Sequence, residues 1–189
     1  NPNSNLSSSQ VVYVAIGTSV EDASNNAINA ANASFTAADI LAPTMTITSA
    51  EVTDGATSND STLSMTFTSG EATSNFVVGD ISVSGGALSS FNATSSTVYT
   101  ATFTPSGDGA KTIDVAGGAF TDSSSNNNSA ATQFNWSYDS SSPTMAITSA
   151  EVTDGATSDD STLAMTFTTS KATSNFVVGD ISASGGVLS

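Results

Sequence analysis

The stretch PTMTITSAEVTDGATSNDSTLSMTFTSGEATSNFVVGDIS begins at Pro43, and it begins again at Pro143 as PTMAITSAEVTDGATSDDSTLAMTFTTSKATSNFVVGDIS. The offset between the two copies is 100 residues, without a gap. When residues 43–89 are compared with 143–189, eight of the 47 positions differ, so 39 match. An uninterrupted period of this length indicates tandem whole domains. We therefore expect one complete unit at 43–142 and the front half of a second unit at 143–189.

Apolar and polar residues alternate along the complete unit, with threonine and serine at most of the intervening positions. This is the pattern of strands with one face buried. The alternating segments are 44–48, 62–68, 97–104, 113–115 and 134–138, and residues 76–84 and 88–91 supply one or two more strands. Turn-forming sequences such as Asp54-Gly55 separate them. About seven short strands predict an all-β fold, an antiparallel β-sandwich.

The composition excludes several classes of partner. Lys and Arg total two against 17 Asp and Glu, which gives a net charge of −15. Nucleic acids and anionic membrane surfaces attract Lys and Arg, so neither is expected as a partner. The absence of His and Cys removes the usual nucleophile–base pairs, and we expect no enzyme activity. No apolar run approaches 18 residues, so no membrane insertion is expected.

Residues 1–42 allow two interpretations. Shifted by 100 positions, Asp22 falls on Asp122, Asn26 on Asn126 and Asp39 on Asp139. These matches favour the back end of a preceding, diverged repeat. The alternative is an N-terminal extension with an amphipathic helix, since apolar residues at 20, 23, 27, 28, 31 and 35 follow helical spacing and Ser19 is a possible cap. Asparagines in the same stretch are poor helix formers and weigh against the helix.

A set of segments in the complete unit resembles a known family. PTMTIT, TLSMTFT, FVVGDISVSGGALSSF, VYTATFTP, VAGGAFTDSSSNN and FNWSYD are similar, in this order, to the bacterial Ig-like repeats of very large surface adhesins. The resemblance implies tandem Ig-like antiparallel β-sandwiches arranged end to end through short linkers such as Asp139–Pro143. It also implies an extracellular or cell-surface protein whose repeats form a fibre or adhesin stalk that projects from cells or links them. In related adhesins, calcium ions at domain junctions often stiffen the array.

The residues themselves suggest where calcium would bind. The loop after the first strand carries Asp54 and Asp60, the turn at 105–109 carries Asp108, and Asp139 lies in the linker. In a sandwich of this topology these four carboxylates are expected at one domain junction, where a cation would relieve their repulsion. Glu71 and Asp122 are expected at the opposite end, and Glu71 is set aside as a ligand because the second copy has Lys171 there. Aspartate is also a common turn residue, which leaves a plain structural interpretation open.

The sequence offers candidate sites for two modifications. Six asparagines begin N-x-S/T triplets and are candidate glycosylation sites: Asn5, Asn32, Asn59, Asn92, Asn127 and Asn135. Such triplets also arise by chance in a chain rich in Asn and Ser. A Lys–Asn crosslink would require a buried lysine, and Lys111, the single lysine of the complete unit, is instead expected at the surface near a turn.

The second unit at 143–189 holds front-half strands without their partners. One explanation is that the sequence is an excerpt of a longer stalk. The other is a self-assembling filament in which residues 1–42 of one chain complete residues 143–189 of the next, head to tail. A glycan- or protein-binding module is a further alternative for the function, although near-identical copies argue against a dedicated binding head.

Overall fold

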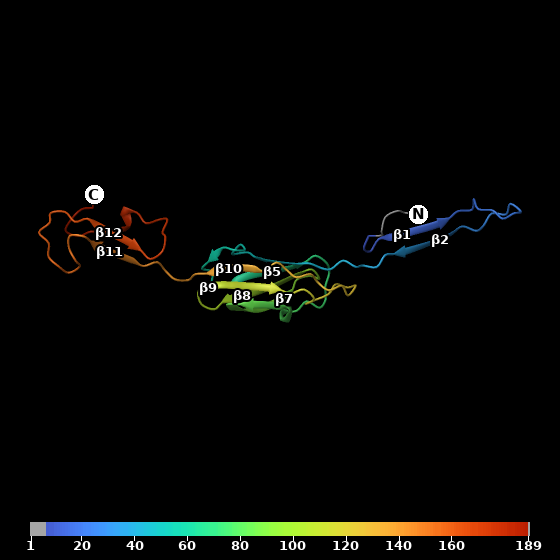
Figure 1. Cartoon of the computed structure of the whole chain (residues 1–189), viewed down its shortest axis with the longest axis horizontal. Coiled ribbons are helices and arrows are strands. Elements are labelled where there is room, and N and C mark those ends of the chain that lie inside the picture. Colours follow the sequence, from blue (N-terminus) through green and yellow to red (C-terminus); the bar gives the residue numbers. More distant parts are fainter. Residues whose placement is uncertain (1–6, 189) are drawn as a thin grey trace. The chain divides into compact units, whose positions relative to one another are not determined.

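The computed structural model describes residues 7–188, and its regular elements there are strands and two short 3-10 helices (Figure 1). The chain divides into two units, one that ends at Ser140 and one that starts at Ser141. In the described part of the chain, no helix has the length and apolarity needed to cross a membrane.

The complete repeat is a β-sandwich of two four-stranded sheets, as the alternation predicts. One sheet has the order β3-β5-β8-β7 and the other β4-β10-β9-β6. Neighbouring strands are antiparallel except β4 and β10, which pair in parallel. The strands are β3 Met45–Ser49, β4 Thr57–Ser58, β5 Leu63–Ser69, β6 Ile81–Ser84, β7 Gly86–Ala93, β8 Val98–Pro105, β9 Gly109–Val115 and β10 Phe134–Tyr138.

The core lies between the two sheets and is rich in aromatic rings. Phe103 of β8 is fully buried, and its ring meets that of Trp136 of β10 edge to face at a centroid distance of 4.8 Å. Phe76 contacts the rings of Tyr99 and Phe120 at 5.0 and 5.2 Å. Edge-to-face contacts of this kind are the favoured aromatic geometry. The alternating residues thus point inward, as a half-buried strand requires.

One segment predicted as strand has a different local structure. Residues 76–84 begin with an irregular stretch and the 3-10 helix η1, Val78–Asp80, and only then form β6. The Asp80 carboxylate accepts a hydrogen bond of 2.8 Å from the Val77 N–H, which holds the chain in a turn before the strand. A local side-chain bond of this kind competes with the sheet ladder, and alternation does not reveal it.

Lys111 corrects the expectation of a surface lysine, because only 2 % of it is exposed. It lies on β9 opposite Trp136. A Cβ atom at Gly85 would come within 2.6 Å of the Lys111 Cδ, and Gly85 also has a positive φ of 75°. The aliphatic stem of Lys111 therefore packs over the turn between β6 and β7, where only glycine leaves room.

Residues 11–36 form an antiparallel hairpin of β1, Val11–Ile16, and β2, Ala31–Thr36. The helix considered for residues 20–35 is therefore wrong. The apolar positions that follow helical spacing instead divide between a long turn and β2. The pairing of β1 with β2 overrides the weak helical periodicity. The asparagines of this stretch, which are poor helix formers, also argue against a helix.

The second unit repeats the local structure of the first. Strands β11, Met145–Ser149, and β12, Met165–Thr169, pair in the register of β3 and β5, and η2, Val178–Asp180, repeats η1. The burial differs, however. Met65 is 1 % exposed and its counterpart Met165 is 41 % exposed.

We predict that Phe103→Ala destabilises the sandwich by about 3–5 kcal/mol, because it removes a fully buried ring and leaves a cavity beside Trp136. Trp136 is the single tryptophan of the chain, so its fluorescence during denaturant unfolding reports this domain alone. The exposed Val77→Ala is the control and should change the free energy of unfolding by less than about 0.5 kcal/mol. Equal effects of the two substitutions would contradict the assigned core.

Candidate metal centre

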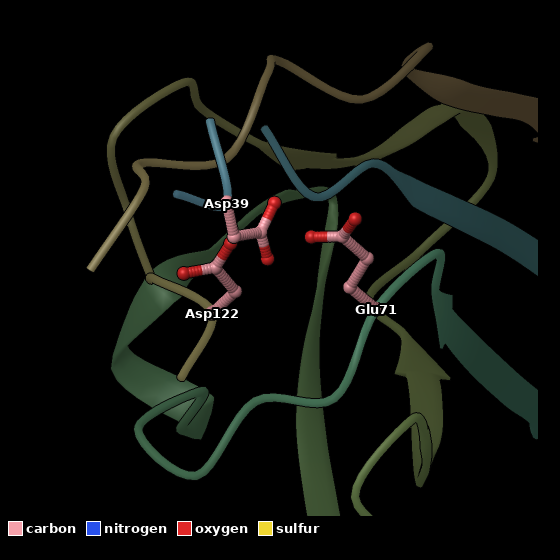
Figure 2. A group of neighbouring side chains, drawn as sticks. All are labelled: Asp39, Glu71 and Asp122. Atoms are coloured by element: carbon pink, nitrogen blue, oxygen red, sulfur yellow. The ribbon is translucent and has the colours of Figure 1, made fainter. Parts of the chain in front are cut away.

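Three carboxylates from distant parts of the sequence meet at one end of the sandwich. Asp39 lies in the linker, which we define as residues 37–43 between β2 and β3. Glu71 follows β5, and Asp122 lies in the turn between β9 and β10. Figure 2 shows the three carboxyl groups facing one another, and one oxygen of each lies within 4.8 Å of the others. We call this set the acidic cluster.

A tight turn fixes the position of Asp122. Its Oδ1 accepts hydrogen bonds from the backbone N–H groups of Ser124, at 2.8 Å, and Asn126, at 2.9 Å. Its Oδ2 accepts a third bond from the Asn126 side chain, at 2.8 Å. Burial by itself would raise the pKa of Asp122, but these three donors lower it below its usual value. Asp122 is therefore a buried carboxylate held in its charged form.

Hydrogen bonds attach Asp39 to both sides of the linker. Its Oδ1 accepts a bond of 2.6 Å from the Ser8 hydroxyl, and its Oδ2 accepts one of 3.3 Å from the Ser124 hydroxyl. The Asn126 side chain also donates to the Asp39 backbone carbonyl at 3.2 Å. The bond from Ser8, together with the Leu41 N–H, lowers the pKa of Asp39. The linker is thus anchored on the turn that carries Asp122.

Glu71 has one carboxylate oxygen that lacks a hydrogen bond within the described chain. Its Oε2 is shielded from solvent and receives no hydrogen bond from the residues that the structure describes. Burial raises the pKa of Glu71 above its usual value, and the charges of Asp39 and Asp122 raise it further. A bound proton or a nearby cation is therefore favoured at Glu71 more than at an isolated glutamate.

The arrangement fits the chemistry of a hard divalent cation. Calcium binds carboxylate and carbonyl oxygens at 2.3–2.6 Å, so two oxygens that share one ion lie at most about 5 Å apart. The three oxygens of the acidic cluster meet this limit. Asp39, Glu71 and Asp122 would supply the charged ligands, and backbone carbonyls and water would complete the shell. A cation there would tie the linker to the sandwich.

The four carboxylates expected to bind calcium lie elsewhere. Ser58 joins two of them, because its hydroxyl bonds the Asp60 carboxylate and its carbonyl accepts the Asp139 N–H at 3.0 Å. Asp108 accepts two bonds of 2.8 Å from Ser140, in the same region.

Asp54 is separated from this group. Its carboxylate accepts a hydrogen bond of 2.6 Å from the backbone N–H of Asn135. Asn135 lies three residues before Tyr138, the last residue of β10, which is roughly 10 Å along the strand. Among residues 7–188, the carboxylates brought within one ion's reach are those of the acidic cluster. Calcium at Asp54, Asp60, Asp108 and Asp139 stays a prediction.

The repeat contains the signal that points to the acidic cluster. Asp39 is the counterpart of Asp139, so an aspartate precedes each copy of the repeat by four residues. The replacement of Glu71 by Lys171 argues against Glu71 as an essential ligand. In the second unit, however, the Lys171 Nζ donates to the carbonyl and hydroxyl of Ser141, at 2.7 and 2.6 Å. The ammonium group thus contacts residue 141, in the segment that corresponds to the linker one period earlier. The exchange is compatible with a cation at the first linker.

The candidate glycosylation sites differ in accessibility. Asn5 lies outside the described residues. Four of the candidate sites are exposed: Asn32, Asn59, Asn92 and Asn127. Asn135 is half-buried on β10, and its side chain donates to the Gln133 carbonyl at 2.9 Å. The exposed four therefore remain sterically possible sites, and Asn135 is the poorest of the described ones.

We predict that calcium raises the midpoint of thermal unfolding of the 43–138 sandwich by roughly 5 °C at saturating concentration, because it binds the folded state selectively. The variant Glu71→Lys, which copies the residue at 171, should lose this response and unfold at a similar temperature in calcium and in chelator. Asp60→Asn is the matched control and should keep the response. Calorimetry of the full chain measures all three proteins.

The same calcium response in the wild-type protein and in Glu71→Lys would contradict a site at the acidic cluster. Loss of the response in Asp60→Asn would place the ion at the other end of the sandwich.

Comparison with known proteins agrees with the architecture. A family model described as a bacterial Ig-like domain matches residues 39–138, more than half of the chain. The match begins at Asp39, so the linker aspartate belongs with the sandwich that it contacts. The searches of curated proteins and of solved structures each gave no match. With its two-sheet sandwich and this match, the chain belongs to the bacterial Ig-like domain family.

Proposed function

We propose that this chain is a structural repeat of an extracellular fibre or cell-surface adhesin stalk that projects from cells or links them. The observation that carries the proposal is the repeat itself. A domain of the bacterial Ig-like family is followed after 100 residues by a near-identical beginning, in which 39 of 47 positions match. Near-identical domains in series add length, whereas a binding head is usually unlike its stalk. We infer that successive sandwiches lie end to end, because the linkers between them are short.

The charge of the chain supports an extended assembly in an aqueous exterior. Two basic residues against 17 acidic ones leave a net charge of −15. Like-charged neighbouring domains repel one another, which favours separation and solubility over collapse. Divalent cations would screen this repulsion and, at the acidic cluster, would tie a linker to its sandwich. Calcium is therefore the cofactor that we propose, with a stiffening role.

We also propose that the chain has no enzymatic role. A hydrolase built on paired carboxylates would need an acid and a base on either side of a substrate. In the acidic cluster, Asp122 is committed to three hydrogen bonds and Asp39 to the linker. These bonds favour a role in positioning the backbone.

The proposal is tested in the bacterium that carries the gene. Antibodies raised against residues 43–138 should stain intact cells, and protease treatment of intact cells should remove the signal. A cytoplasmic protein serves as the control and should remain unstained and uncleaved. Deletion of the gene should then reduce attachment of the cells to one another or to surfaces. Staining that requires permeabilised cells would contradict a surface or extracellular location.

A further inference from the structure

The two copies of the repeat differ most densely at the ends of β5 and β12. Residues 43–89 and 143–189 differ at eight positions, and three of these are consecutive. The consecutive changes are Ser69 to Thr169, Gly70 to Ser170 and Glu71 to Lys171. Strand β5 ends at Ser69 and β12 ends at Thr169, so the changes begin at equivalent strand ends. The contacts of these residues therefore distinguish the two copies.

In the second copy, the changed side chains bond the segment that leads into β11, residues 141–144. We call this the second entry segment. The Ser170 Oγ accepts a hydrogen bond of 2.9 Å from the Thr144 N–H. The Lys171 Nζ donates to the Ser141 carbonyl at 2.7 Å and to the Ser141 hydroxyl at 2.6 Å. All three bonds lie inside the second unit, so they do not depend on how the two units are placed.

The first entry segment, residues 41–44, is held differently. The Gly70 N–H donates to the Thr44 carbonyl at 3.0 Å, but glycine has no side chain that could accept the Thr44 N–H. Glu71 places a carboxylate where the second copy has an ammonium group. A further bond, of 3.0 Å, comes from the Ser129 N–H, which belongs to the segment between β9 and β10. The first entry segment therefore receives part of its support from a distant part of the sequence.

The chemistry of the two residue pairs explains why they act differently. An ionised carboxylate is an acceptor only, and so is a backbone carbonyl, so Glu71 cannot bond a carbonyl of the chain without an intervening donor or cation. A lysine ammonium carries three donors and its own positive charge. Lys171 therefore bonds the backbone directly, whereas a glutamate at the same position requires a cation between two acceptors.

We propose that Ser170 and Lys171 are positioning residues that attach the second entry segment to its sheet without a metal ion. The proposal deepens the structural role proposed above and rests on it, because it names residues that make one linker of the fibre independent of calcium. The residue pair at positions 70 and 71 of the repeat then determines the type of attachment. A Gly–Glu pair leaves it to other groups, and a Ser–Lys pair supplies it directly.

The attachment acts on local opening more than on global stability. The three bonds are exposed, and an exposed hydrogen bond contributes a modest free energy. They converge on four residues, one of which is Pro143, so few backbone groups have to be fixed. Amide hydrogen exchange measures such local opening. The Thr144 and Thr44 amides are the probes, because the first donates to Ser170 and the second faces a glycine.

The complete sandwich provides the decisive test. The double variant Gly70→Ser with Glu71→Lys transfers the Ser–Lys pair into the first copy. A Cβ atom at Gly70 would come within 2.5 Å of the Thr44 Oγ1, which ends a side chain that can rotate, and the second copy already carries serine there. In chelator, we expect the Thr44 amide to exchange about fivefold more slowly than in the wild-type protein. Adding calcium should then have no further effect.

A matched control separates the new donors from the loss of a negative charge. Gly70→Ala with Glu71→Met adds a Cβ atom and removes the carboxylate but supplies no polar group, so it should leave Thr44 exchange near the wild-type rate. The reverse change, Ser170→Ala with Lys171→Met, should speed exchange of the Thr144 amide about fivefold in a polypeptide of residues 1–189, with or without calcium.

Three results would overturn the proposal: equal slowing of Thr44 exchange by the Ser–Lys and the Ala–Met pairs, no change in either copy, or slowing of wild-type Thr144 exchange by calcium. None of them would alter the surface staining of cells, so the failure would leave the proposed structural role intact. The calcium response of Glu71→Lys in calorimetry tests the acidic cluster separately.

Discussion

The structure depends on the ladder that places β9 and β10 between β4 and β6. A strand edge carries unpaired N–H and C=O groups, and an open edge beside an apolar face favours pairing with any available strand. In the complete repeat, β6 pairs with β9 and β4 pairs with β10, and the two sheets enclose the aromatic core. The second unit has nearly the same front-half sequence, but its apolar residues remain exposed. The core of the complete repeat is therefore built jointly by its front-half and back-half strands.

The acidic cluster joins this domain to the chain that precedes it. Asp39 comes from the linker, whereas Asp122 belongs to the turn between the two strands that complete the sandwich. The same turn donates to the linker through Ser124 and Asn126. Protonation or cation binding at Glu71 would thus act on the linker that leads into the sandwich. Lys171 supplies a positive charge at the equivalent position of the second copy, where its ammonium group binds the linker carbonyl of Ser141.

The period and the strand alternation were sufficient to predict most of the fold. Inward residues such as Phe103 and Trp136 follow from alternation, because threonine occupies the opposite face. Residues 78–80 could not be predicted in this way, since a single bond from the Val77 N–H to Asp80 replaces strand by turn. The burial of Lys111 was also missed, because it depends on the space above Gly85, a property of packing. The acidic cluster required knowledge of which carboxylates meet in three dimensions. Asp139 contacts the sandwich before it, through Ser58, whereas Asp39, its counterpart one period earlier, contacts the sandwich after it.

Hydrogen exchange on a polypeptide limited to residues 1–189 tests the dependence of the front half on its partner strands most directly. Residues 63–69, LSMTFTS, and 163–169, LAMTFTT, are nearly identical in sequence; 63–69 form β5, and 165–169 form β12. Only the first pairs with β8 and is covered by the second sheet. We predict that amides in 63–69 exchange at least about 100-fold more slowly than those in 163–169, because local opening is far cheaper in the uncovered copy. Equal protection of the two segments would contradict the account, since the front half would then be stable without the strands that complete it.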